Sequence, residues 1–115
     1  MNYDLEERTA KFGENIIHFV GALTKNEVNK ILINQIVRSA TSIGANYMEA
    51  NQASSKKDFR NKIGICRKEA NETKYWIRMI SSANKNNINE CKILWKESHE
   101  LVLIFSKIFS SSNKN

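Results

Sequence analysis

The chain carries four runs of apolar residues, and within each run they recur every three or four positions. This spacing puts the apolar side chains on one face of an α-helix. Alternation with period two, the pattern of a half-buried strand, is missing. The four predicted faces are Leu5, Phe12, Ile16, Phe19 and Leu23; Val28, Leu32, Ile36, Ile43 and Tyr47; Phe59, Ile63, Cys66, Ala70, Thr73, Ile77 and Ile80; and Ile88, Cys91, Trp95, Ser98, Val102, Phe105 and Phe109. The pattern predicts an all-α protein.

At the start of each run stands a residue able to cap a helix, and an acidic residue follows it three positions later. The cap accepts a hydrogen bond from a free backbone N–H, and the acid favours the positive end of the helix dipole. The four pairs are Asp4/Glu7, Thr24/Glu27, Ser55/Asp58 and Asn87/Glu90. Short polar joints at 24–26, 51–55 and 84–87 make successive helices antiparallel neighbours. We predict one antiparallel up-down-up-down four-helix-bundle domain over residues 1–109, followed by a disordered polar tail over residues 110–115.

The composition agrees with long helices. The 115 residues include no Pro and only four Gly, the two residue types that most weaken a helix interior. The acidic amino terminus lacks the features of a secretory signal, and the most apolar stretch, 101–109, is too short to span a bilayer. Cys66 and Cys91 lack a CxxC motif, which favours buried thiols in a reducing compartment over a disulfide or a zinc site. We expect a cytoplasmic protein without membrane association.

Three of the predicted helices carry a second apolar line beside the first. Its members are Ile17 and Val20, Ile65 and Trp76, and Leu94, Leu101, Ile104 and Ile108. A helix in a small bundle needs one buried face, so a broader face suggests a second buried surface between subunits. The alternative is a wider core seam within one chain. We favour a homo-oligomer.

The net charge of +6 is concentrated in one predicted helix. Residues 54–86 hold nine Lys or Arg against three acids, while the other segments nearly balance. An assembly that presents this helix on a common surface would attract phosphate backbones, whereas in a monomer the residues form an ordinary solvated face. The candidate nucleic-acid-binding residues are Lys56, Lys57, Arg60, Lys62, Arg67, Lys68, Lys74 and Arg78. The neighbouring aromatic residues Tyr75 and Trp76 either stack on bases or pack between helices.

A line of polar residues borders the apolar face of the second predicted helix. Catalysis, a ligand site or a polar network that fixes helix packing would each explain it. A buried Arg38 needs a carboxylate partner, and Glu69 and Glu72 lie at the matching depth of an antiparallel neighbour. We predict a structural network formed by Arg38, Ser39, Asn46, Glu49, Glu69 and Glu72. If the change leaves the carboxylate partner buried and unpaired, Arg38→Ala should cost about 3–5 kcal/mol of stability.

Enzymatic motifs are missing from the sequence. A di-iron centre in a four-helix bundle needs Glu-x-x-His motifs, but Asn15 precedes His18 at that spacing and Lys96 precedes His99. No glycine-rich phosphate loop, GxSxG or HExxH occurs. We therefore expect no catalytic residues, no metal, no cofactor and no small-molecule substrate.

Two long blocks carry a resemblance to a known family. The blocks "RSATSIGANYMEA" at 38–50 and "DFRNKIGICRKEANETKYWIRMI" at 58–80, with the opening "DLEERTAKFGENII", resemble the four-helix-bundle family encoded in intervening sequences of bacterial 23S ribosomal RNA genes. The resemblance covers nearly the whole chain and maps the polar motif of the family to Arg38, Ser39, Asn46, Glu49 and Glu72. Cys66 departs from the small residue usual at its position.

The resemblance implies a ring-shaped assembly, a homopentamer, and most members of the family have no established activity. A relative of the family, the accessory protein of diversity-generating retroelements, is a basic pentamer that binds nucleic acid. Our leading hypothesis is a non-enzymatic oligomer that binds RNA or DNA through the basic third helix. The alternative is a protein-interaction scaffold without a nucleic-acid role.

Overall fold

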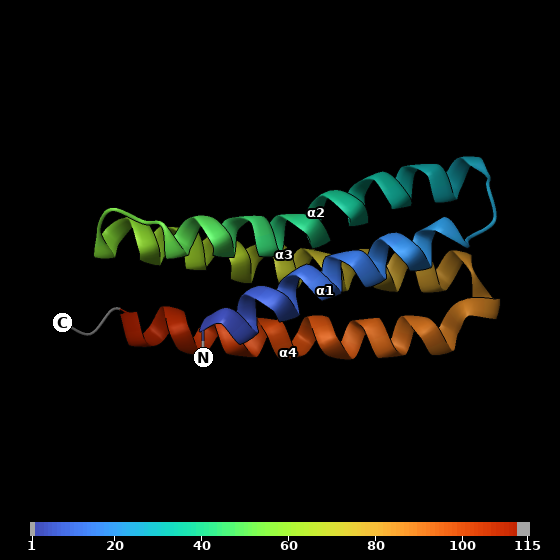
Figure 1. The fold of residues 1–115 in the computed structure, drawn as a ribbon. Coiled ribbons are helices and arrows are strands. Elements are labelled where there is room, and N and C mark those ends of the chain that lie inside the picture. The colour runs from blue at the N-terminus through green and yellow to red at the C-terminus, as the bar shows by residue number, and fades with distance from the viewer. Residues whose placement is uncertain (1, 113–115) are drawn as a thin grey trace.

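The described part of the chain, residues 2–112 of the computed structural model, folds into four α-helices joined by short turns. The helices are α1 Asn2–Gly21, α2 Glu27–Asn51, α3 Lys56–Ala83 and α4 Ile88–Ser112, and a 3-10 turn, η1 Lys85–Asn87, leads into α4. Successive helices run in opposite directions along the long axis, which makes the molecule the predicted antiparallel four-helix bundle (Figure 1). The bundle measures 48 × 20 × 19 Å.

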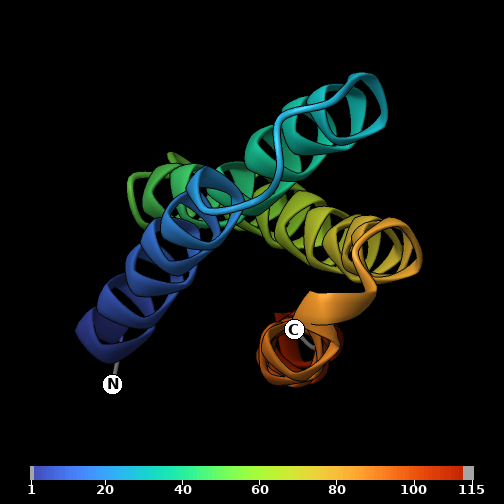
Figure 2. The same cartoon turned by 90° about the vertical axis from the view of Figure 1, so that its right-hand side faces the viewer.

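The four helices do not contribute equally to the bundle. α2 packs along α3 and α3 along α4, while α1 rests mainly on α2 and touches α4 sparsely. Figure 2 shows α1 leaning against α2 and lying apart from α4. A bidentate ion pair nevertheless joins α1 to α4. Arg8 of α1 donates to both carboxylate oxygens of Glu97 of α4 at 2.7 and 2.9 Å. This hydrogen bonding raises the pKa of Arg8.

Side-chain hydrogen bonds cap the starts of α2 and α3. Ser55 caps α3 as predicted, since its hydroxyl accepts from the Asp58 backbone N–H at 3.0 Å. α2 is capped by Asn26 and not by Thr24. Asn26 is extended, with φ −153° and ψ 173°, and its side chain accepts from the Asn29 N–H at 2.8 Å.

The other two predicted caps lie inside helical turns. α1 already begins at Asn2, so Asp4 is in its first turn, where an acid still favours the helix dipole. η1 runs directly into α4, so Asn87 is part of a continuous helical path. The prediction of a cap at Asp4 was wrong because a cap-and-acid spacing also occurs within a first turn, whereas α4 begins at Ile88, directly after Asn87.

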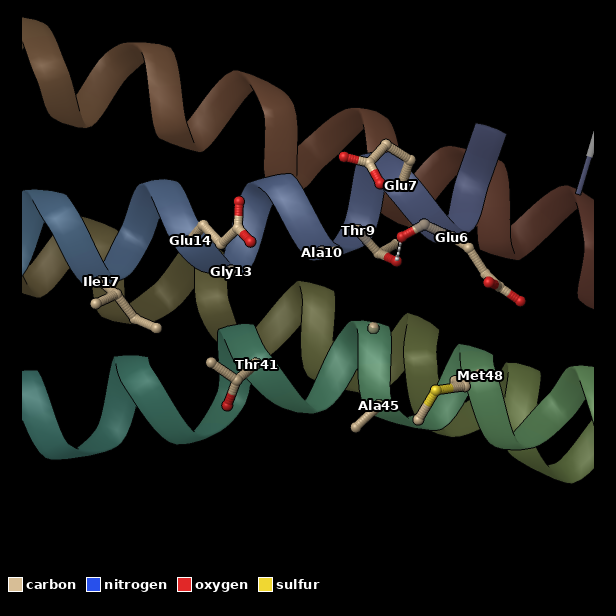
Figure 3. A pocket seen from close by; sticks show the side chains of 11 residues that line it. Glu6, Glu7, Thr9, Ala10, Gly13, Glu14, Ile17, Thr41, Ala45 and Met48 are labelled. Atoms are coloured by element: carbon tan, nitrogen blue, oxygen red, sulfur yellow. Dashed lines mark hydrogen bonds between the residues drawn. The ribbon is translucent and has the colours of Figure 1, made fainter. Parts of the chain in front are cut away.

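Small residues allow α1 and α2 to cross closely. A Cβ atom on Gly44 would lie 3.2 Å from the hydroxyl oxygen of Thr9, and one on Gly13 would lie 3.7 Å from the methyl group of Thr41. Figure 3 shows these two helices with Thr9 and Gly13 on α1 facing Thr41 and Ala45 on α2. The crossing therefore depends on the missing side chain of Gly44, since a Cβ there would have to push Thr9 away.

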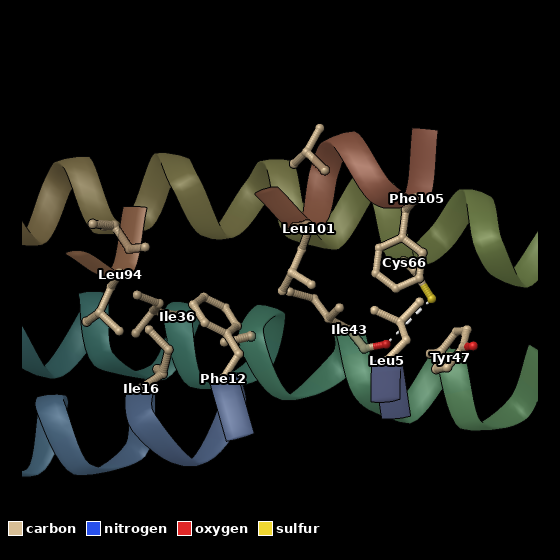
Figure 4. Packing of buried hydrophobic residues seen from close by; sticks show 14 of the residues in the cluster. Leu5, Phe12, Ile16, Ile36, Ile43, Tyr47, Cys66, Leu94, Leu101 and Phe105 are labelled. Atoms are coloured by element: carbon tan, nitrogen blue, oxygen red, sulfur yellow. Dashed lines mark hydrogen bonds between the residues drawn. The ribbon is translucent and has the colours of Figure 1, made fainter. Parts of the chain in front are cut away.

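The core follows the predicted faces with two corrections. Every member of the α3 face is buried or half-buried, and Phe12, Ile36 and Leu101 bring side chains of the three other helices into the same core (Figure 4). Val28 is 56% exposed and Trp95 is 40% exposed, so both predictions of burial were wrong.

The apolar pattern predicted that Val28 is buried, but the structure buries the next residue, Asn29. It forms a reciprocal amide pair with Asn84, with N···O distances of 2.9 and 2.8 Å, and also donates to the Thr24 carbonyl at 2.8 Å. A buried amide is tolerated when its hydrogen bonds are made. This pair joins the first turn of α2 to the end of α3.

The second apolar line belongs largely to the core. Val20, Leu94 and Leu101 are buried, and its remaining members on α3 and α4 are half-buried. Ile17 is the exception, at 47% exposure. The wider-seam interpretation thus explains most of this line. Other large apolar side chains are exposed instead, and among them are Ile31, Met48, Ile93 and Leu103.

The helical region extends further than predicted at the carboxyl end. α4 continues to Ser112, whose hydroxyl donates to the Phe109 carbonyl at 2.8 Å. Residues 110–112 are therefore helical and not part of a disordered tail. Residues 113–115 of the predicted tail lie outside the described residues.

Candidate nucleic-acid interface

Seven of the eight candidate cations lie on one side of α3. At about 100° per residue, their positions fall within an arc of about 120°. We call this set the basic surface; it consists of Lys56, Lys57, Arg60, Arg67, Lys68, Lys74 and Arg78. The acids Asp58, Glu69 and Glu72 of the same helix fall outside the arc. The surface therefore carries seven positive charges and no carboxylate of its own helix.

Three cations of the basic surface lie over aromatic rings of α4. Arg60, Arg67 and Lys74 follow one another at intervals of seven residues, close to two helical turns, and so line the edge that faces α4. The guanidinium carbons of Arg60 and Arg67 lie 3.7 and 4.3 Å from the ring centre of Phe109. The Lys74 ammonium lies 4.8 Å from the ring centre of Trp95. A cation held over a ring is attracted to its negative face and keeps a defined position.

These three side chains have no carboxylate partner in the part of the chain that the structure describes. Lys74 donates instead to Nδ1 of His99 at 3.0 Å, and His99 stacks on Trp95 with ring centres 5.1 Å apart. The Nε atom of Arg60 is buried without a hydrogen-bond partner among residues 2–112. The positive charge on this edge is therefore not neutralised within the described chain.

The remaining members of the basic surface are exposed. Lys56, Lys57, Lys68 and Arg78 form no ion pair within residues 2–112. Tyr75 lies among them at 54% exposure, with its ring edge to face with Trp76. An exposed aromatic ring between cations is a feature of surfaces that bind single-stranded nucleic acid.

Lys62 is the one candidate that the structure separates from the others. It points toward α2, where its ammonium lies 2.8 Å from a carboxylate oxygen of Glu49. That hydrogen bond raises the pKa of Lys62. The charge of Lys62 is thus neutralised by a neighbour, unlike the charges of the basic surface.

Arg38 meets two carboxylates of α3, but it is not buried. Its guanidinium lies 3.3 Å from Glu69 and also contacts Glu72, while 49% of its side chain remains exposed. The Glu69 side chain is only 11% exposed, and the Trp76 indole donates to Glu72 at 3.1 Å. The prediction of a buried Arg38 was wrong, because its long side chain reaches the carboxylates from the rim of the α2–α3 seam.

The other members of the predicted polar network form separate contacts. Ser39 is buried, with its hydroxyl oxygen 2.8 Å from that of Thr73 on α3. Asn46 donates within α2 to the carbonyl and hydroxyl oxygens of Ser42 at 2.9 and 3.0 Å. Glu49 is exposed and pairs with Lys62. The sequence pattern missed Thr73 as a partner, although its spacing had placed Thr73 on the core face.

The two cysteines are buried free thiols. Burial raises the pKa of the Cys66 thiol to about 12, and its sulfur lies 3.5 Å from the Ile43 carbonyl oxygen. Burial also raises the pKa of Cys91. A thiol with so high a pKa stays protonated at neutral pH and is a poor nucleophile.

Within residues 2–112, no three His, Cys, Asp or Glu side chains come together as metal ligands would. None of the described helices is long and apolar enough to cross a membrane.

Comparisons with known proteins agree with the fold and the motifs. A crystal structure of a protein with unknown function from the S23 ribosomal protein family of Bacteroides thetaiotaomicron VPI-5482 is similar, with a TM-score of 0.84. The two chains are 32% identical, over 95% of this chain and 97% of that one. No curated protein matches the chain. The 23S rRNA-intervening sequence protein family matches residues 1–107, and the chain belongs to this family.

Proposed function

We propose that this protein is a non-enzymatic, cytoplasmic homo-oligomer that binds RNA or DNA through the basic surface of α3. The observation that carries the proposal is the set of seven cations without a carboxylate partner in the described chain. Phosphate groups would supply the missing negative charge, and their release of counterions makes such binding favourable at low salt.

The cations held over aromatic rings favour a binding role for the basic surface over the alternative of an ordinary solvated helix face. Arg60, Arg67 and Lys74 are already positioned by Phe109 and Trp95, so less conformational entropy is lost when they meet a phosphate. The exposed ring of Tyr75 offers a stacking position for a base. Oligomerisation would multiply the charge presented to one nucleic acid and so strengthen binding through avidity.

Neutralising the exposed cations tests the binding part of the proposal. The triple variant Lys57→Gln, Lys68→Gln, Arg78→Gln should bind a labelled structured RNA about tenfold or more weakly at low salt, because three phosphate contacts are lost. Fluorescence anisotropy measures the change. The matched control removes three exposed charges elsewhere, with Lys11→Gln, Lys25→Gln and Lys30→Gln. Equal losses in both variants, or no binding by the wild-type protein, would contradict the proposal.

Light scattering tests the oligomer. The family resemblance implies five copies, so the expected mass is near five times the 13.2 kDa of one chain. The mass should increase when RNA is added at low salt.

A protein-interaction scaffold is the second candidate, favoured by the exposed apolar side chains of Ile17, Met48 and Leu103. A protein partner that stays bound after nuclease treatment, together with absent RNA binding, would favour this candidate.

A further inference from the structure

A groove runs along the outer side of the α1–α2 crossing, away from the basic surface. It has a volume of about 710 Å³ and is formed by both helices (Figure 3). Ala10, Gly13, Gly44 and Ala45 contribute small side chains or none, so an approaching side chain can come close to both backbones.

The rim of this groove is acidic and its ends are apolar. Glu6, Glu7 and Glu14 line it from α1. Glu7 and Glu14 have neither a hydrogen-bond partner nor an ion-pair partner among the side chains of residues 4–112, while Glu6 accepts from Asn51 at 2.9 Å. Ile17 and Met48 are 47% and 56% exposed. The groove therefore suits a surface that combines an apolar side chain with flanking positive charges.

The outer face of α4 has this combination. Lys96 and Lys107 flank Leu103, and all three are exposed, with Leu103 at 55%. Their spacings of seven and four residues place them on one face of the helix. Glu100 is exposed on the same face, and its carboxylate lies 3.7 Å from Arg8 of α1. Neither lysine has an ion pair within the described chain. We call Lys96, Leu103 and Lys107 the α4 stripe.

We propose that the α1–α2 groove of one copy receives the α4 stripe of a second copy. Leu103 would lie over the floor near Gly13 and Gly44, and Lys96 and Lys107 would pair with Glu7 and Glu14. Glu7 and Glu14 lie about 10 Å apart along α1, and Lys96 and Lys107 about 16 Å apart along α4, so the long lysine side chains would have to reach inward to make both pairs. This proposal rests on the homo-oligomeric part of the proposed function.

The contact joins two different surfaces, so it is heterologous. Each copy offers one groove and one stripe, and successive copies then form a closed ring or an open chain according to the rotation between them. The basic surface of α3 takes no part in the contact. Nucleic acid and neighbouring copies would therefore not compete for the same residues.

Charge reversal followed by charge exchange tests the contact. The variants Glu7→Lys/Glu14→Lys and Lys96→Glu/Lys107→Glu should each lower the mass measured by light scattering toward the 13.2 kDa of one chain. The quadruple variant that combines them restores opposite charges across the contact and should regain the wild-type mass. The control Lys57→Glu/Lys68→Glu lies on α3 and lowers the net charge by as much as Lys96→Glu/Lys107→Glu does. It should keep the wild-type mass. Circular dichroism confirms that each variant is helical.

A substitution pair tests the apolar part of the contact. Leu103→Asn should lower the mass, whereas Ile93→Asn, at another exposed position of α4, should not. A wild-type oligomer that keeps its mass in every charge variant would overturn this contact while leaving the oligomer intact. A monomeric wild-type protein would overturn both the homo-oligomer and the second copy as the occupant of the groove.

Discussion

The charged side chains on the two sides of α3 have different kinds of partner. On the side facing α2, Glu69 and Glu72 meet Arg38, and Lys62 meets Glu49. On the side facing α4, Arg60, Arg67 and Lys74 lie over aromatic rings and meet no carboxylate of the described chain.

This difference separates charges that hold the helices together from charges that are available to a partner. A paired charge contributes to packing, and losing its partner costs stability. An unpaired cation held over a ring keeps its full charge and its position, so it can still attract a phosphate. Substitutions on the α2 side should therefore change stability, and those on the α4 side should change binding.

The largest expected effect is on the side facing α4. Replacing both Arg60 and Arg67 with Gln should weaken RNA binding about 100-fold, or ~2.7 kcal/mol, because two positioned guanidinium groups are lost. Anisotropy at low salt measures this change. The unfolding midpoint in urea should move little, because Gln retains part of the packing against Phe109. A loss of stability without a loss of affinity would show that the two arginines are structural.

The next effect is on the side facing α2. Arg38→Ala should lower the free energy of unfolding by about 1–2 kcal/mol, because Glu69 is left nearly buried without its partner. This estimate is smaller than the about 3–5 kcal/mol expected for a carboxylate left fully buried and unpaired, since half of the Arg38 side chain is exposed and water reaches the pair. Chemical denaturation measures the change, and RNA affinity serves as the control that should stay constant.

A third effect concerns the core side of the same helix. Burial raises the pKa of Cys66 from the usual 9.0 to about 12, so the unfolded chain loses this proton at a lower pH than the folded protein. The contribution to stability is complete below pH 9.0 and decreases as the pH rises toward 12, by at most ~1.4 kcal/mol per pH unit. Urea titrations at several alkaline pH values measure the slope. The slope should become shallower in Cys66→Ala, and an unchanged slope would assign it to other groups.

The smallest effect separates Lys62 from the basic surface. Lys62→Gln should change RNA affinity less than about twofold, because its charge is already neutralised by Glu49. Lys68→Gln, on the basic surface of α3, is the matched substitution and should weaken binding severalfold. Equal effects at both positions would remove the distinction between paired and unpaired cations.

Much of the fold could be predicted from the sequence, because helical periodicity is a local property. The α3 face was predicted correctly at every position, and Ser55 caps the helix as its spacing indicates. Val28 was wrong because it occupies the first turn of α2, where the side that faces the bundle is instead taken by the paired amide of Asn29. An apolar pattern does not identify a buried amide that has found a partner in another helix.

The candidate site was predictable only in part. The seven-residue spacing of Arg60, Arg67 and Lys74 is visible in the sequence and indicates one face. Their positions over Phe109 and Trp95 depend on the register between α3 and α4, which is set by packing along the whole seam. The separation of Lys62 likewise needed the position of Glu49 on another helix.

The salt dependence of RNA affinity tests the central claim most directly. If the basic surface binds phosphates, the logarithm of the association constant should fall with the logarithm of salt concentration with a slope steeper than about −3.5, corresponding to four or more phosphate contacts. The slope should become shallower in the variants of Arg60 and Arg67. A wild-type affinity that barely changes with salt, or no binding at low salt, would contradict the account.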